Sequence, residues 1–202
     1  MSAADLHDLF AVLALVALAL AVLLLVARLV PSVASVRFLD AVHRVQLPIA
    51  AVIAVTATTG SLWFSESAGW IPCRFCWFQR IFMYSLAVIL TIAALRRDRG
   101  VKWFAAPLAI IGMCISLWHI LLEHGVIDEG TRCDPKAPCA VPWAISLGTR
   151  DPLTLGPSEW HAFTLAVMAF CGFAAILALL LAPEPLTLES LEEEEDGESQ
   201  AG

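Results

Sequence analysis

The stretch Pro72-Cys73-Arg74-Phe75-Cys76-Trp77-Phe78-Gln79-Arg80 places a Cys-x-x-Cys pair at the mouth of a long apolar segment. Two thiols in this spacing can close a small, reactive disulfide, and the start of a helix favours the thiolate that carries out exchange chemistry. Pro72 lacks an amide hydrogen and suits the first position of a helix. A second pair, Cys133 and Cys139, lies in a later loop. Two dithiols beside a bilayer predict electron transfer from protein thiols to an acceptor dissolved in the membrane.

The composition is that of an integral membrane protein. Of the 202 residues, 59% are hydrophobic and 15% are charged, whereas soluble domains have about 45–50% and about 25%. Several apolar runs are long enough to cross a hydrocarbon core, which takes roughly 20 helical residues. We predict helical spans at residues 9–30, 45–64, 78–95, 104–122 and 161–182. The expected fold class is therefore an all-α membrane bundle.

The first apolar run is interpreted as a true span and not as a signal peptide. Its leader contains Asp5 and Asp8 but no Lys or Arg. Its apolar run is also longer than the roughly 7–15 residues of a signal-peptide core.

Lys and Arg in the short connections predict the orientation in the membrane. They gather in and next to the first connection (Arg28, Arg37, Arg44) and in the third (Arg96, Arg97, Arg99, Lys102), so both connections are expected to face the cytoplasm. The loop before Cys76 and the loop over residues 123–160 then face outward. Both cysteine pairs therefore fall where disulfides persist.

The formal net charge of −7 comes from a short C-terminal segment. Its acidic residues are Glu189, Glu192, Glu193, Glu194, Glu195, Asp196 and Glu198. A charge run without apolar periodicity is typical of a solvated, disordered tail. No basic patch indicates a nucleic-acid partner.

Arg80 follows Cys76 by four residues, one turn deeper on the same helical face. An arginine at this depth in a membrane is costly unless it has a function. It can stabilise the Cys76 thiolate or hold a carbonyl oxygen of a redox cofactor. The alternative is an anchor whose charged head reaches the interface.

The Cys133–Cys139 loop encloses five residues, among them Pro135 and Pro138. A disulfide across so short and stiff a loop gains little chain-entropy stabilisation, and strained or exposed disulfides tend to exchange. A purely structural disulfide remains an alternative. A zinc site built from all four cysteines is a further one, but the second pair is wider than the usual C-x₂₋₄-C spacing. Cys114 and Cys171 stand alone in apolar spans and are assigned no role.

Three polar residues, His119, Glu123 and His124, close the fourth span at its outer end. His119 and Glu123 are one turn apart and can share a face. A histidine near the interface can hydrogen-bond a quinone carbonyl or relay protons to it. We take His119 and His124 as candidate cofactor-binding residues; a simple polar helix end is the alternative.

Taken together, these residues resemble the bacterial disulfide-bond formation protein B (DsbB) family, in its branch with a compact second loop. The motif is Pro72-Cys73-x-x-Cys76-x-x-Gln79-Arg80 followed by Ile81, Met83 and Tyr84, with the Glu123-His124 step as a weaker match. The resemblance covers about residues 45–182 and implies a four-helix membrane domain with two extracytoplasmic cysteine loops. Residues 1–44 then add one transmembrane helix and a cytoplasmic connection, and residues 183–202 form the acidic cytoplasmic tail.

The resemblance implies a dithiol:quinone oxidoreductase of the bacterial plasma membrane. Its catalytic residues would be Cys73, Cys76, Cys133 and Cys139. Cys76 would contact the ring of a ubiquinone or menaquinone, with Arg80 beside it. An extracytoplasmic, DsbA-like partner of the thioredoxin fold would attack the Cys133–Cys139 disulfide. Electrons would then pass to Cys73 and Cys76 and on to the quinone.

Three other readings compete with this one. A vitamin-K-epoxide-reductase-like quinone oxidoreductase also combines a helical bundle with two thiol pairs, but there the quinone-facing pair follows the loop pair in sequence, and here it comes first. A non-catalytic membrane scaffold would use its disulfides to brace the outer loops. A metal-handling membrane protein would bind its ion through the thiols.

Overall fold

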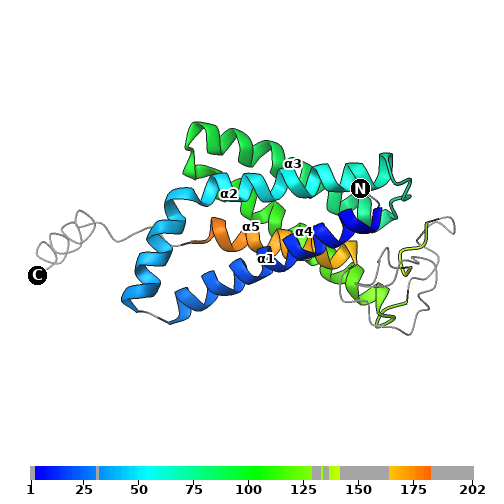
Figure 1. Ribbon diagram of the computed structural model, residues 1–202, viewed down its shortest axis with the longest axis horizontal. Helices are drawn as coiled ribbons and strands as arrows, with labels where there is room; N and C mark the ends of the chain where they lie inside the picture. The colour runs from blue at the N-terminus through cyan, green and yellow to red at the C-terminus, as the bar shows by residue number, and fades with distance from the viewer. Residues whose placement is uncertain (1–2, 31, 129–132, 134–136, 142–163, 183–202) are drawn as a thin grey trace, which may run out of the picture.

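The computed structural model describes residues 3–30, 32–128, 133, 137–141 and 164–182. These residues form five α-helices and one 3-10 helix (Figure 1). In chain order they are α1 (Ala3–Leu29), α2 (Val33–Glu66), α3 (Arg74–Arg96), η1 (Arg99–Val101), α4 (Lys102–Glu123) and α5 (Leu165–Leu180). The first four α-helices are long and apolar enough to cross a bilayer, and α5 is apolar but shorter. The prediction of an all-α membrane bundle is confirmed.

The helices follow the predicted spans except in the first connection. The structure continues α2 through residues 33–44, where the sequence indicated a linker. Ser32 caps this helix by accepting a hydrogen bond from the Ser35 amide at 3.1 Å, and Arg44 pairs with Asp40 one turn earlier at 2.7 Å. Pro48 removes one helical hydrogen bond, which favours a bend in the preceding turn. Figure 1 shows the start of α2 at a steep angle to its remainder. Residues 161–163 of the fifth predicted span and the acidic tail lie outside the described residues.

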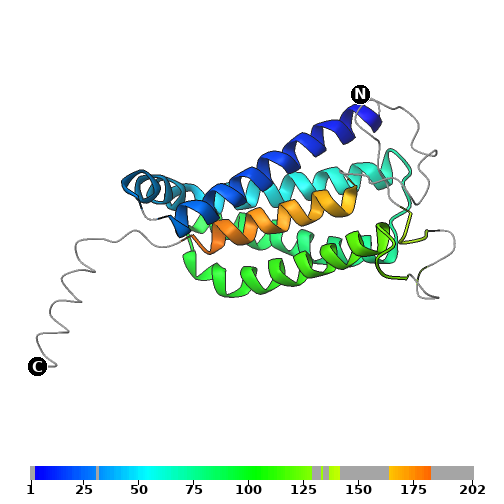
Figure 2. The ribbon, with the colours of Figure 1, turned by 90° about the horizontal axis from the view of Figure 1, so that it is seen from below.

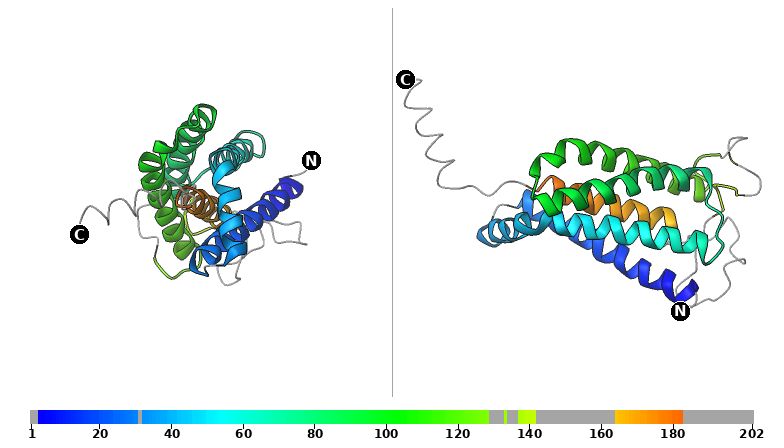
Figure 3. Two further views of the ribbon diagram at one scale, coloured as in Figure 1. Left: turned by 90° about the vertical axis from the view of Figure 1, so that its left-hand side faces the viewer. Right: turned by 90° about the horizontal axis from the view of Figure 1, so that it is seen from above.

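Helices α2, α3, α4 and α5 pack in a ring, and α1 packs against α5 and α2 on its outside (Figures 2 and 3). Fully buried side chains of α3 and α5, including Leu86, Leu90, Phe173 and Ile176, fill the centre. Many outward-facing side chains are large and apolar, as a surface in contact with lipid requires. Because successive helices run in opposite directions, the start of α3, the end of α4 and the start of α5 meet at one end of the bundle.

Small residues allow the helices to approach one another closely, as is common in membranes. At Gly112 of α4, an added Cβ would overlap the ring of Phe173, which is fully buried in α5. At Gly172 of α5, an added Cβ would lie 3.4 Å from the flexible end of Met83. The two glycines therefore differ in the space around them.

We expect Gly112→Ala to lower the thermal unfolding midpoint in detergent. Overpacking costs about 1–3 kcal/mol, which exceeds the gain of about 1 kcal/mol in helix propensity. Gly172→Ala is the matched control and should be neutral or stabilising. Equal midpoints for the two variants would show that the contact between Gly112 and Phe173 does not constrain the packing of α4 on α5.

Candidate functional site

The Cys-x-x-Cys pair lies at the first turn of α3, as the sequence indicated. Cys73 is the N-cap residue, and its sulfur accepts a hydrogen bond from the Cys76 amide at 3.2 Å. The two Sγ atoms are 2.7 Å apart, and both cysteines are free thiols in this structure. A sulfur in the N-cap position takes the place of the oxygen that usually satisfies the first amide groups of a helix. The helix start thus favours negative charge on Cys73.

The surroundings of Cys73 favour its thiolate form. The pKa of Cys73 is lowered to about 5, chiefly by the hydrogen bond from the Cys76 thiol and against the opposing effect of burial. The hydrogen bond from His119 acts in the same direction as that from Cys76. Cys73 is therefore the thiolate of the pair at neutral pH, in line with the expectation for a cysteine at a helix start.

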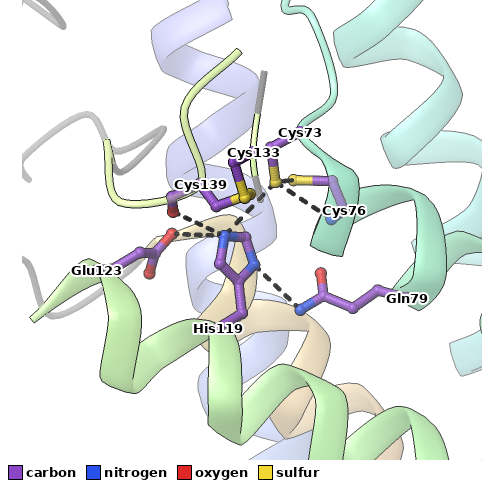
Figure 4. Close-up of a disulfide and its surroundings, with 7 residues drawn as sticks. All are labelled: Cys73, Cys76, Gln79, His119, Glu123, Cys133 and Cys139. Carbon is purple, nitrogen blue, oxygen red and sulfur yellow. Dashed lines mark hydrogen bonds and ion pairs between the residues drawn. A yellow bond between two sulfur atoms is a disulfide. The ribbon is translucent and has the colours of Figure 1, made fainter. Parts of the chain in front are cut away.

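His119 of α4 contacts both cysteine pairs through one ring nitrogen. Its Nε2 lies 3.6 Å from the Cys73 sulfur and 3.1 Å from the carbonyl oxygen of Cys139. On the other side of the ring, the amide nitrogen of Gln79 is 3.3 Å from Nδ1 (Figure 4). With Gln79 donating to Nδ1, the ring proton is on Nε2 and points to the sulfur and the carbonyl oxygen. His119 is itself buried, with 3% of its surface exposed.

Cys133 and Cys139 form a disulfide, and Cys139 is fully buried. Figure 4 shows this disulfide beside Cys73, above the ring of His119. The loop that carries it is thus held to the end of α4 through the Cys139 carbonyl. While this disulfide is present, its two sulfurs are not available as thiolate ligands for a metal ion. The ligand atoms of Cys73, Cys76 and His119 lie within 4.8 Å of one another and form a possible three-donor group.

Glu123 adds a carboxylate to the cluster, next to the same nitrogen of His119. Its Oε1 is 3.8 Å from Nε2 of His119, and its Oε2 accepts a hydrogen bond from the Thr164 hydroxyl at 2.6 Å. Both Glu123 and Thr164 are buried. The sequence placed His119 and Glu123 on one face, and the structure agrees. His124 is the C-cap residue of α4, and the contacts that join the two cysteine pairs come from His119.

Three residues of the site, two around His119 and one beside Arg80, were not assigned roles from sequence. Gln79 is a buried amide in an apolar span, a feature that marks a specific partner. Thr164 caps α5, and its hydroxyl has two hydrogen-bond partners. Its position immediately before an apolar run is the sequence signal of a helix cap. Ser61, which binds Arg80, gave no signal, since a serine in a helix commonly bonds its own backbone.

A cavity of about 310 Å³ opens beside Cys76. Gln79, Arg80 and Tyr84 of α3 line it together with Cys76, and apolar side chains of α1, α2 and α5 complete it. Cys73 and His119 are not part of its lining. The two cysteines therefore face different surroundings: Cys73 the loop disulfide, and Cys76 the cavity.

Arg80 is held against α2 at the cavity wall. Its Nε donates to the Ser61 hydroxyl at 2.9 Å and its Nη2 to the Ser61 carbonyl at 2.8 Å, and the guanidinium lies 5.2 Å from the centre of the Trp77 ring. The hydroxyl oxygen of Tyr84, one turn further along α3, is buried and has no hydrogen-bond partner among the described residues. A buried hydroxyl without a partner in a cavity wall is a donor available to a ligand.

Comparison with known proteins connects this arrangement to disulfide formation. The family model described as disulfide bond formation protein DsbB matches residues 43–183. A probable disulfide formation protein of Deinococcus radiodurans is 40% identical over 140 residues, which cover 68% of this chain and 88% of that protein. Disulfide bond formation protein C of Bacillus subtilis is 44% identical over 90 residues, covering 44% of this chain and 65% of that protein. No solved structure matches significantly.

We expect the thiolate absorbance of the reduced protein to titrate with a midpoint at about pH 5. Because the pKa of Cys73 is lowered, its thiolate persists above that pH and is lost as the pH falls through it. The ultraviolet difference between the wild type and Cys73→Ser isolates this thiolate. His119→Leu should raise the midpoint, because it removes a donor to the sulfur. A midpoint near the ordinary value of 9.0 in the wild type would contradict the assignment.

Proposed function

The chain belongs to the disulfide bond formation protein DsbB family, and from this membership we propose that it is a membrane thiol:quinone oxidoreductase. In this proposal it reoxidises an extracytoplasmic, DsbA-like thiol oxidase and passes the electrons to a membrane quinone. One observation carries the proposal: a single nitrogen, Nε2 of His119, contacts both cysteine pairs, while Cys76 faces a cavity.

The first step takes place at the loop disulfide. A thiolate of the partner attacks Cys133 or Cys139, and the second partner thiol resolves the mixed disulfide. The partner leaves with its own disulfide, and the loop holds two thiols. A loop thiolate then attacks the Cys73–Cys76 disulfide, so that the loop disulfide forms again and Cys73 and Cys76 hold the electron pair.

His119 supports the transfer by holding the proton at Nε2. From that position it donates toward the Cys73 sulfur and stabilises negative charge there. The same nitrogen fixes the Cys139 carbonyl, which keeps the loop disulfide against the α3 pair. The loop thiols release two protons when their disulfide forms again, and Cys76 takes up one of them because Cys73 remains a thiolate; the His119–Glu123 pair lies where it can pass this proton on.

The cavity beside Cys76 fits a quinone. Its walls are largely apolar, and its volume of about 310 Å³ lies within the range of ligand sites. Arg80 and Tyr84 bring donors to one side of it, and the Tyr84 hydroxyl lacks a partner among the described residues. When bound, the quinone accepts two electrons and two protons. The Cys73 thiolate, 2.7 Å from the Cys76 sulfur, is positioned to close the disulfide as the electrons leave.

The proposed orientation places the cysteine pairs outside the cytoplasm of a bacterial cell. Arg96 ends α3, and Arg99 and Lys102 lie at the turn between α3 and α4, at the opposite end of the bundle from Cys73. The positive-inside rule then assigns that end to the cytoplasm. In this orientation the acidic tail, which lies outside the described residues, follows α5 on the cytoplasmic side.

We expect cysteine variants to separate the two half-reactions. Purified protein in detergent would be given a reduced thiol oxidase of the thioredoxin fold and a quinone, and quinone absorbance would be followed. Cys76→Ser should abolish quinone reduction, and Cys133→Ala should abolish oxidation of the partner, because each removes one member of an exchanging pair. Cys114→Ser, on the lipid-facing surface, is the control and should keep wild-type turnover. Sustained partner turnover by both Cys76→Ser and Cys133→Ala would defeat the relay and favour structural disulfides.

We expect Tyr84→Phe to weaken quinone binding while the shape of the cavity is kept. Loss of one hydrogen bond, worth about 1 kcal/mol, corresponds to roughly a fivefold higher apparent KM for quinone. The rate at which the partner reduces the protein, measured without quinone, should not change. An unchanged KM would remove the Tyr84 hydroxyl from the proposed quinone site.

A further inference from the structure

The N-terminal helix α1 lies outside the residues that the family model matches, which begin at residue 43. It packs against α5 and α2. Ala11, Ala14 and Ala17 are buried on its inner face, whereas Ala19 is exposed on its outer face. The small inner side chains let α1 approach the bundle closely.

The inner face of α1 also forms one wall of the cavity beside Cys76. Phe10, Leu13, Ala14, Ala17 and Leu20 line the cavity at spacings of three or four residues, which places them on one side of the helix. From Phe10 to Leu20 this wall extends about 15 Å along the helix axis. Val16 also lines the cavity, so every α1 residue in the lining is apolar.

Phe10, the first residue of this wall, packs closely against Gly60 of α2. A Cβ added at Gly60 would overlap the ring of Phe10, so the absence of a side chain on Gly60 makes room for this ring. Phe10 also meets the edge of Phe64, with the ring centres 5.9 Å apart. These contacts fix Phe10 at the end of α1 nearest the cysteine pairs.

The polar side chains in the cavity lining come from α3 and, at Thr56 and Ser61, from α2. Cys76, Arg80 and Tyr84 come from α3, whereas α1 offers no polar side chain to the lining. An occupant with a reactive polar ring and a hydrocarbon chain would therefore place the ring at α3, and its chain would have the long apolar wall of α1 to lie along. A membrane quinone has these two parts.

We propose that α1 is a specificity-determining part of the quinone site, with Ala14, Ala17 and Leu20 binding the isoprenoid tail. This inference rests on the proposed function. It assigns to the additional helix a role in ligand binding, beyond that of an extra membrane anchor. Substitutions on the inner face of α1 should then change the affinity for a quinone with a tail and leave the affinity for the tailless ring unchanged.

The test compares Ala17→Phe with Ala19→Phe, the same change on the inner and outer faces of α1. Binding is measured by quenching of tryptophan fluorescence, with ubiquinone carrying a short isoprenoid tail and with the same ring lacking the tail. Filling the wall at Ala17 should weaken binding of the tailed quinone about tenfold, as overpacking of a fitted site does. Binding of the tailless ring should stay unchanged, and Ala19→Phe should bind both compounds as the wild type does.

Leu20→Ala provides a second variant in case Ala17→Phe does not fold. It removes apolar surface from the wall and should weaken binding of the tailed quinone severalfold, again without effect on the tailless ring. Wild-type affinity for the tailed quinone in Leu20→Ala and in any folded Ala17→Phe would overturn the role of α1. An equal loss for both compounds would also overturn it, because the effect would then not concern the tail.

Turnover separates this inference from the proposed function. Suppose that the wild type reduces quinone and that Ala17→Phe and Leu20→Ala bind the tailed quinone with wild-type affinity. The inference on α1 then fails and the proposed function stands. If tailed-quinone binding responds to α1 but the wild type does not reduce quinone, the proposed function fails alone. If the wild type binds neither compound, both fail.

Discussion

The buried ring of His119 is the contact on which the arrangement of both cysteine pairs depends. One of its nitrogens faces the Cys73 sulfur and the Cys139 carbonyl, and the other is fixed by Gln79. An imidazole with a single proton can donate from one nitrogen only. The Gln79 contact therefore decides that this donor faces the Cys73 sulfur and the Cys139 carbonyl. Without it, the ring could present a lone pair to the Cys73 thiolate and repel it.

The helical repeat places the functional side chains of α3 on different sides of the helix. Cys73 is the cap residue and lies outside the cavity lining, next to the loop disulfide, whereas Cys76 begins the cavity wall. Arg80 and Tyr84 follow Cys76 at intervals of four residues, so the same face continues into the membrane. A guanidinium within a bilayer is costly, and the Ser61 hydroxyl and carbonyl offset part of this cost. One helix thus presents a thiolate to one side and a line of donors to the other.

The sequence predicted the parts of this structure that depend on local pattern. Long apolar runs located the helices, and the position of the Cys-x-x-Cys pair at a helix start indicated a lowered thiol pKa. Contacts between distant segments were harder to foresee. His119 and His124 are both near the end of α4, and no local rule distinguishes the one that faces the cysteines. The pairing of Thr164 with Glu123 joins residues 41 positions apart. The cavity wall on α1 depends on the packing of α1 against α2 and α5, which apolar periodicity does not specify.

The lowered pKa of Cys73 also bears on the direction of electron flow in the proposed relay. A thiolate that is stable at neutral pH stabilises the reduced form of its pair, and a disulfide whose reduced form is stabilised is the stronger oxidant. The Cys73–Cys76 disulfide is therefore favoured to draw electrons from the loop thiols. His119 and Cys76 produce this bias, since both donate to the Cys73 sulfur. The same stabilisation makes the reduced pair a weaker reductant, so the final acceptor must have a still higher potential. A membrane quinone that binds next to Cys76 meets this requirement if its reduction potential is higher than that of the Cys73–Cys76 pair.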